Sequence, residues 1–144
     1  MKPQNYSNYM RTIPAFHYFL VPLGLATSAA SIAYLFVAER SWETLFTSLI
    51  AVSLSLMAVM TMVFARMFAC KAQDRAIRAE ENLRHFVLTG KRLDPRLNMS
   101  QIIALRFASD DEFLSLCERG AETDMASDDI KRSIQSWKAD YDRV

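Results

Sequence analysis

The sequence has few cysteines, glycines and prolines, and two long stretches of it carry no charge. Among 144 residues there are 2 Cys, 3 Gly and 4 Pro. Two cysteines cannot build the disulfide framework of a small secreted domain, and three glycines exclude a collagen-like repeat. No Asp, Glu, Lys or Arg occurs in residues 12–38 or in residues 44–65. Over a third of the chain is therefore strongly apolar, which argues against a fully soluble enzyme.

Each uncharged run is long enough to cross a lipid bilayer as a helix. At about 1.5 Å per residue, either run covers the roughly 30 Å hydrocarbon core. The first run ends in Tyr34-Leu35-Phe36-Val37, which lacks the small residues of a signal-peptide cleavage site, so we interpret it as a retained span. Only residues 39–43 join the two runs. The sequence thus predicts a two-helix transmembrane hairpin.

Basic residues flank the outer ends of this hairpin. Lys2 and Arg11 precede the first run, whereas the connector has only Arg40 beside Glu39 and Glu43. Four further basic residues follow the second run closely: Arg66, Lys71, Arg75 and Arg78. The positive-inside rule then places both termini in the cytoplasm. We expect these four side chains to contact lipid headgroups. Nucleic-acid binding, which would require several aromatic residues interleaved with the basic ones, is not expected here.

The second span continues beyond the membrane in this interpretation. No Pro or Gly occurs from Arg66 to Leu88, and Gly90 suits a C-cap, so one helix of about 45 residues is expected. Within its cytoplasmic part a stripe recurs at four-three spacing: Ala72, Ala76, Ala79, Leu83 and Phe86. We call these five residues the seam. Either the seam joins subunits of a homo-oligomer, or it packs on the chain's own C-terminal helices.

The remaining chain predicts three short helices that form a cytoplasmic cap. Asn98 or Ser100 can cap residues 101–107, Ser109 with Glu112 makes a capping box for residues 110–119, and Ser127 can cap residues 128–137. We expect one small core made of these apolar residues: Ile102, Ile103, Leu105, Phe107, Phe113, Leu114, Leu116, Cys117, Ile130, Ile134 and Trp137. No strand-like alternation persists, so the fold class is all-α.

The expected organisation has four parts. Residues 1–13 form a cytoplasmic N-terminal segment, residues 14–66 the hairpin, residues 67–90 the extension of the second helix, and residues 91–144 the helical cap. Acidic residues outnumber basic ones beyond Leu97. This surplus suggests a soluble partner at the cap.

The sequence offers few groups for catalysis or for binding a metal. His17 and His85 are its two imidazoles, and neither Cys70 nor Cys117 has a Cys or His neighbour at metal-ligand spacing. The three glycines stand alone, so there is no phosphate-binding loop. We therefore predict no cofactor, no metal and no enzymatic activity. The spacing of Arg78 and His85 resembles the Arg-to-His motif of helical RNases of the HEPN type, which gives a remote alternative, a membrane-tethered RNase. Ala79 stands where that motif carries a polar residue.

Hydroxyl residues follow one face of the second span. Thr44, Ser48 and Ser55, which we call the hydroxyl stripe, recur at helical spacing. Small hydroxylated residues let helices pack closely, so a helix-packing face is one interpretation. The other is an oligomeric pore lined by this stripe, with Arg66 at its cytoplasmic mouth favouring anions. No intramembrane Asp or Glu is present, which argues against a proton relay.

Several short strings make the chain resemble a known group of proteins: Gln4-Asn5-Tyr6, Gln73-Asp74-Arg75-Ala76-Ile77-Arg78, Ala104-Leu105-Arg106-Phe107-Ala108-Ser109-Asp110, and Trp137-Lys138-Ala139-Asp140-Tyr141-Asp142-Arg143-Val144. The chain resembles a family of small bacterial membrane proteins with two spanning helices, catalogued as a domain of unknown function. The resemblance implies a bacterial inner-membrane location and a short cytoplasmic helical domain, and it implies no activity. The function we predict is a membrane-anchored homo-oligomeric structural or interaction protein.

Overall fold

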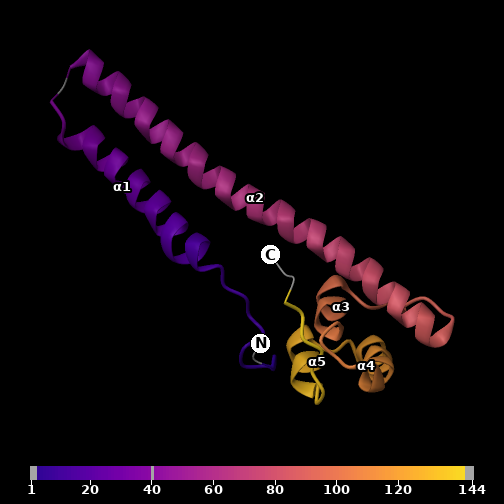
Figure 1. Ribbon diagram of the computed structural model, residues 1–144. Coiled ribbons are helices and arrows are strands. Elements are labelled where there is room, and N and C mark those ends of the chain that lie inside the picture. Colours follow the sequence, from indigo (N-terminus) through magenta and orange to yellow (C-terminus); the bar gives the residue numbers. More distant parts are fainter. Residues whose placement is uncertain (1–2, 40, 142–144) are drawn as a thin grey trace. The chain divides into compact units, whose positions relative to one another are not determined.

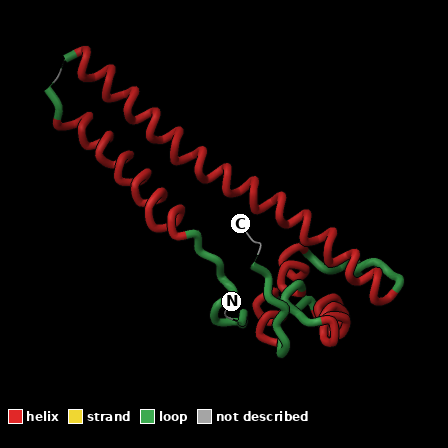
Figure 2. The backbone as a smooth tube through the Cα atoms, in the orientation of Figure 1, coloured by secondary structure: helices red, strands yellow, loops and turns green. Residues whose placement is uncertain are grey.

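The chain is all-helical throughout the part that the computed structural model describes, which is residues 3–39 and 41–141 (Figures 1 and 2). The elements are a π-helix η1 (Ala15–Leu20) and the α-helices α1 (Val21–Val37), α2 (Trp42–Thr89), α3 (Met99–Leu105), α4 (Asp110–Thr123) and α5 (Ser127–Ser133). The predicted all-α class is confirmed. Within the described ranges the one β feature is an isolated antiparallel bridge between Ala108 and Trp137. Lys2, Arg40, Asp142 and Arg143, which entered the charge analysis, lie outside those ranges.

The chain divides into two compact units. We call Thr12–Phe68 the apolar unit, and Met1–Arg11 with Ala69–Val144 the cap unit. Two helical stretches, Ala15–Val37 and Trp42–Thr89, are long and apolar enough to span a membrane. Only 6% and 11% of their most apolar windows are buried within the chain. A core helix of a soluble protein would be mostly buried, so these exposed apolar surfaces favour a lipid environment.

The first apolar stretch begins with a π-helix that the sequence analysis did not predict. The amide of Val21 donates to the carbonyl oxygen of Phe16, five residues back, instead of four. Pro22 follows directly, and it has no amide hydrogen with which to continue an α-helical ladder to Tyr18. The wider turn therefore ends at Leu20, and α1 begins at Val21 with Pro22 in its first turn.

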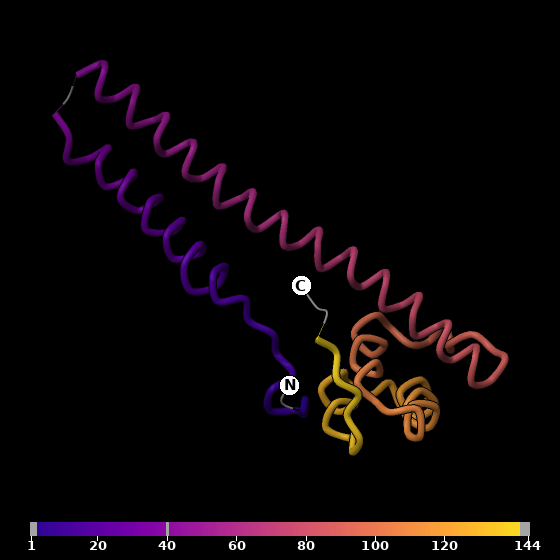
Figure 3. Tube along the Cα trace, in the orientation of Figure 1, coloured from indigo at the N-terminus to yellow at the C-terminus, as the bar shows by residue number. Residues whose placement is uncertain are grey.

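In the apolar unit α1 and the first part of α2 lie side by side and run in opposite directions (Figures 1 and 3). A Cβ added at Gly24 would lie 2.7 Å from Met62 Cε and 3.4 Å from Val59 Cγ2. Because real Cβ contacts are longer than the first of these, Gly24 allows the two helices to approach closely. Met62 would have to move to accept any larger residue at this position.

Helix α2 runs for 48 residues from Trp42 to Thr89. Ser41 caps its start, since its Oγ accepts the amide hydrogen of Thr44 at 3.1 Å. Gly90 ends it with φ of +71°, a left-handed conformation that glycine adopts without strain. The Gly90 amide donates to the carbonyl oxygen of Phe86 at 2.8 Å. Local chemistry thus defines both ends of the helix.

In the cap unit the helix starts differ in part from those expected. Asn98 and Gln101 form a reciprocal capping box at the start of α3. The predicted box between Ser109 and Glu112 is wrong, because the Glu112 carboxylate instead accepts the backbone amides of Gln135 and Ser136, at 3.1 and 2.9 Å. The Glu112 side chain, which its spacing from Ser109 assigns to a capping box, therefore forms tertiary hydrogen bonds instead.

The last helix is shorter than its sequence pattern predicts. Helix α5 begins at Ser127 itself, after Ala126 as N-cap, and ends at Ser133 rather than at Trp137. Beyond it the chain becomes extended, and the Lys138 amide donates to the carbonyl oxygen of Phe107 at 2.7 Å. This pairing with the loop after α3 competes with helix continuation, and it turns Trp137 onto the core.

The core of the cap unit contains all the apolar residues expected for it. Most are buried, while Ile103, Leu114 and Trp137 are partly buried and pack against the others. Eight further members of this core were not predicted: Ile77, Leu93, Leu97, Ala104, Ala108, Tyr9, Ala121 and Met125. Ile77 comes from α2 and Tyr9 from the N-terminal segment. Both therefore help to bury a core that three short helices could not close alone.

Candidate interaction surface

Within the cap unit, α2 has one covered face and one open face. Ile77 and Glu81, 5% and 6% exposed, lie on the covered face with Arg84. These residues follow one another at intervals of four and three, so they share one side of the helix. The C-terminal helices and their loops pack on this side.

Arg84 is the main polar link between α2 and the rest of the cap unit. Its Nε donates to Asp110 Oδ1 at 2.7 Å and its Nη2 donates to the Ala108 carbonyl oxygen at 2.8 Å. Its Cζ lies 4.1 Å from the centre of the Phe113 ring. Its Nη1 lies 3.2 Å from Glu81 Oε2. The four-apart pair of Glu80 with Arg84, which the spacing favours, is thus replaced by contacts with Glu81 and Asp110.

Glu81 is a buried acid on this covered face. Loss of hydration raises the pKa of its carboxyl above the ordinary value of 4.5, although the nearby Arg84 guanidinium lowers it. Burial disfavours the charged carboxylate more than the single ion pair favours it. The same packing raises the pKa of the Cys117 thiol to about 12, chiefly by desolvation and also through Glu81. Cys117 therefore stays protonated and unreactive at neutral pH.

The seam occupies the open face of α2. Its alanines Ala72, Ala76 and Ala79 are exposed, and Leu83 and Phe86 are 63% and 53% exposed. The chain's own C-terminal helices pack on the other side of α2. The exposure of the seam therefore does not favour the interpretation in which these helices cover it. An apolar stripe on a helix that already has a packed side is available to another molecule.

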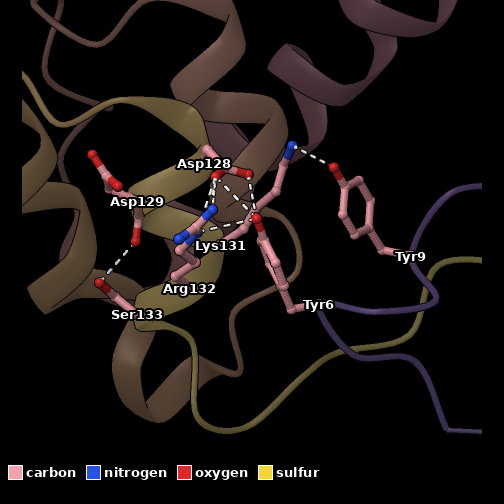
Figure 4. Close-up of polar contacts among 7 residues, drawn as sticks. All are labelled: Tyr6, Tyr9, Asp128, Asp129, Lys131, Arg132 and Ser133. Atoms are coloured by element: carbon pink, nitrogen blue, oxygen red, sulfur yellow. Dashed lines mark hydrogen bonds and ion pairs between the residues drawn. The ribbon is translucent and has the colours of Figure 1, made fainter.

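The N-terminal segment binds the C-terminal end of the cap unit. The Gln4 side chain forms two hydrogen bonds with the backbone of Asp140. Its Nε2 donates to the carbonyl oxygen at 3.1 Å, and its Oε1 accepts from the amide at 2.8 Å. The Tyr6 hydroxyl donates to the Asp128 carboxylate at 2.9 Å and accepts from Arg132 Nε at 3.0 Å (Figure 4). We call these contacts, together with those of Tyr9, the terminal clasp.

Tyr9 supplies the apolar part of the terminal clasp. Its ring centre lies 6.0 Å from that of Phe107 and 6.2 Å from that of Trp137. On the other side Lys131 Nζ lies 4.6 Å from the ring centre, and Figure 4 shows this lysine reaching toward the tyrosine hydroxyl. The hydrogen bonds of the clasp join residues more than 120 positions apart, and they make the N-terminal segment part of the cap unit.

The hydroxyl stripe lies in the apolar unit, where most of it is buried. Ser48 and Ser55 are 1% and 9% exposed, and Thr44 is half-buried. The Ser48 hydroxyl donates to the Thr44 carbonyl oxygen at 2.6 Å, and the Ser55 hydroxyl donates to that of Val52 at 2.9 Å. Hydroxyls bonded to their own helix need no further partner. This geometry supports the helix-packing interpretation, and the pore interpretation stays an untested prediction.

The four basic residues after the second run belong to both units. The Arg66 guanidinium carbon lies 5.6 Å from the centre of the Phe16 ring within the apolar unit. Lys71, Arg75 and Arg78 are exposed in the cap unit. Their contact with lipid headgroups stays a prediction, as does a soluble partner for the acidic residues of the cap.

Within the described residues, 3–39 and 41–141, no hydrogen bond or ion pair joins Arg78 and His85. Arg78 is exposed, while the half-buried His85 uses Nδ1 to bond the Lys91 carbonyl oxygen at 2.8 Å. His85 thereby helps to end α2. No group of three metal-binding side chains occurs among the residues described. The RNase alternative stays a prediction that this geometry does not favour.

Comparison with known protein families gives a match that spans the whole chain. Residues 1–144 match the model of a family of unknown function, DUF6526. The chain belongs to this family. No curated protein and no solved structure matches the chain. Membership in DUF6526 agrees with the resemblance that the four sequence strings carry, and it assigns no reaction or ligand.

The strings that carry the family resemblance contain part of the terminal clasp, but the contact between them was not predicted. Gln4-Asn5-Tyr6 and the string that begins at Trp137 carry the family resemblance, and the structure bonds Gln4 to Asp140. Short polar strings at opposite ends of one chain were the available signal. Nothing in their spacing states that they contact each other, because the pairing depends on the fold between them.

Proposed function

We propose that this chain is a membrane-anchored structural protein that assembles with copies of itself through the seam. The observation that carries the proposal is that the seam is exposed on the side of α2 opposite to the one that the cap covers. An enzyme would need a constellation of reactive groups. Arg84 instead uses its hydrogen bonds to join α2 to Ala108 and to Asp110 at the start of α4.

The anchor in this proposal is an antiparallel hairpin of two spanning helices in a bacterial inner membrane, with both termini in the cytoplasm. Its support is the length and apolar character of Ala15–Val37 and Trp42–Thr89. The terminal clasp adds independent support, because a chain with two spans whose ends bind each other has both ends on one side. Arg11 and the basic residues after the second span make that side the cytoplasm by the positive-inside rule.

The seam suits association between anchored molecules. Three alanines allow close approach of helices, and Leu83 and Phe86 add larger apolar surface at one end. Two heptads alone are short for a stable coiled coil in dilute solution. Anchoring in a shared membrane raises the effective concentration of the seams, so that a weak contact suffices for assembly.

The test is the mass of the assembly after a single substitution in the seam. Leu83→Asp places a charge on the apolar stripe, and we expect the purified protein to change from an oligomer to a monomer in lipid nanodiscs, as measured by mass photometry at two concentrations. Leu88→Asp is the matched control, because it makes the same substitution on the same helix outside the seam. It should leave the oligomer intact. A parent protein that is monomeric at both concentrations would refute the proposal.

A further inference from the structure

The seam has the register of a two-stranded coiled coil. Its spacing places Ala76 and Leu83 at a positions and Ala72, Ala79 and Phe86 at d positions of consecutive heptads. In this register the covered face consists of b and f positions, namely Ile77, Arg84 and Glu81. These positions point away from an a/d seam. The cap therefore packs chiefly on the side away from the seam, although Ala76 and Leu83 also border hollows that cap residues such as Lys138 and Asp110 line.

The flanks of the seam carry opposite charges. Arg75 occupies the g position on one flank, and Glu80 occupies the e position of the following heptad on the other flank. Both side chains are exposed. Arg84, which spacing would pair with Glu80, bonds Glu81 and Asp110 instead. The Glu80 side chain is exposed beside the seam, where it also lines a hollow with Lys138.

We propose that the occupant of the seam is a second copy of this chain, bound as a parallel two-stranded coiled coil whose register is fixed by Arg75 of each copy and Glu80 of the other. The inference rests on the proposed function and specifies its geometry. In a parallel pair, a g residue faces the e residue of the next heptad in the other strand. Two-fold symmetry then forms the Arg75–Glu80 ion pair twice.

The antiparallel alternative has the wrong charges. Antiparallel strands bring like flanks together, so the Glu80 flanks would face each other and the Arg75 flanks would face each other. Like charges at such positions are destabilising. Membrane anchoring also favours the parallel arrangement. Two copies inserted with the same topology in one membrane have their α2 helices pointing in the same direction. The other positions on the flanks, Gln73, Asn82, Val87 and Thr89, are uncharged, so this one pair decides the orientation.

Charge reversal tests the register in the full-length protein in nanodiscs. Arg75→Glu and Glu80→Arg each convert two attractive contacts into two repulsive ones, and we expect each to weaken the dimer about tenfold at low salt. The double variant Arg75→Glu with Glu80→Arg should restore the parent affinity to within about twofold. Arg78→Glu is the control, because Arg78 lies on the same helix outside both flanks. It should change the affinity by less than about twofold.

Disulfide cross-linking tests the orientation independently. In a background with Cys70→Ser and Cys117→Ala, the single variants Ala72→Cys and Leu83→Cys should each form a disulfide with their own kind, because equal positions face each other in a parallel pair, whereas antiparallel strands bring a d position opposite an a position. When the two variants are mixed, disulfides between different variants should not exceed a background yield. That background is the yield obtained when either variant is mixed with Arg78→Cys, whose cysteine lies outside the seam. Mixed disulfides in place of self-disulfides would indicate antiparallel strands and would overturn the inference.

The outcomes separate this inference from the proposed function. Loss of the dimer in Leu83→Asp, combined with unchanged affinity in both charge reversals, refutes the Arg75–Glu80 register and leaves assembly through the seam intact. A parent mass of three or more copies refutes the two-stranded arrangement. A monomeric parent removes both proposals together. Weakening by each single reversal and recovery in the double variant support the register.

Discussion

Arg84 combines three kinds of contact on one side chain. It donates to the Asp110 carboxylate, donates to the backbone carbonyl of Ala108, and lies over the ring of Phe113. A guanidinium suits this position because its donors are fixed in a plane whose face can still stack on an aromatic ring. A lysine could form one of these contacts at a time. The residue thus orients the start of α4 against α2.

Glu81, beside Arg84, makes the stability of the cap unit depend on pH. Burial raises the pKa of its carboxyl in the folded state above its ordinary value of 4.5. The stability that the protonated form contributes is complete below pH 4.5, and it is lost as the pH rises through the raised pKa. Glu81→Gln keeps a neutral side chain of similar shape at every pH. We therefore expect Glu81→Gln to raise the melting temperature relative to the parent at pH 7.5 and to leave it nearly unchanged at pH 4.5.

Fluorescence of Trp137 during thermal unfolding measures this effect, since Trp137 packs on Phe107 at 5.2 Å between ring centres. The Trp42→Phe background removes the other tryptophan, which is 85% exposed. Glu118→Gln, an exposed acid on α4, is the control and should show no such dependence on pH. If Glu81→Gln were less stable than the parent at pH 7.5, the ion pair with Arg84 would outweigh the cost of burial.

At the scale of elements, the N-terminal segment acts as a structural part of the cap unit. Tyr9 is partly buried and packs between Phe107 and Trp137. We expect Tyr9→Ala to lower the free energy of unfolding of the cap unit by about 2 kcal/mol, because it removes an aromatic ring from a small core. Urea unfolding followed by Trp137 fluorescence in the Trp42→Phe background measures this loss.

Two variants define how this result is interpreted. Tyr18→Ala makes the same substitution at an exposed site in the apolar unit and should leave the Trp137 transition unchanged. Tyr6→Phe removes only the exposed hydrogen bonds to Asp128 and Arg132, and it should cost less than about 1 kcal/mol. An unchanged transition in Tyr9→Ala would mean that the N-terminal segment does not stabilise the cap.

The sequence predicts those elements whose cause is local and misses those whose cause is distant. The unbroken helical pattern ended by Gly90 and the cap at Asn98 follow from nearby residues, and the structure contains both. The early end of α5 depends on the hydrogen bond between Lys138 and Phe107, and the failed box at Ser109 depends on Glu112 reaching Gln135 and Ser136. Such pairings require the folded arrangement, which periodicity does not contain.

The same distinction applies to the candidate surface. Four-three spacing identifies the seam residues from the sequence alone. It cannot state which side of α2 the cap covers, because Ile77 and Leu83 are equally apolar candidates for that role. The structure decides between them by burying Ile77 and exposing Leu83. The choice depends on partners such as Arg84 and Asp110, which lie 26 positions apart.

For the whole molecule, the terminal clasp limits the topology that the proposed membrane anchoring allows. A chain with two spans can bond Gln4 to Asp140 only when both ends lie on the same side. In a background with Cys70→Ser and Cys117→Ala, we expect Ser7→Cys and Glu118→Cys to react with a membrane-impermeant maleimide only after the cells are lysed. Glu43→Cys in the connector should react in intact spheroplasts. All three positions are exposed, so their labelling should report sidedness rather than burial.

Denatured samples give the control for this experiment, because all three cysteines must then react equally. Labelling of Ser7→Cys and Glu118→Cys from opposite sides would contradict the clasp, since residues separated by a bilayer of roughly 30 Å cannot be hydrogen-bonded neighbours. Labelling of both from outside, with Glu43→Cys protected, would keep the clasp and reverse the orientation expected from the basic residues. The two results separate a claim about contacts within the cap unit from a claim about charge and topology.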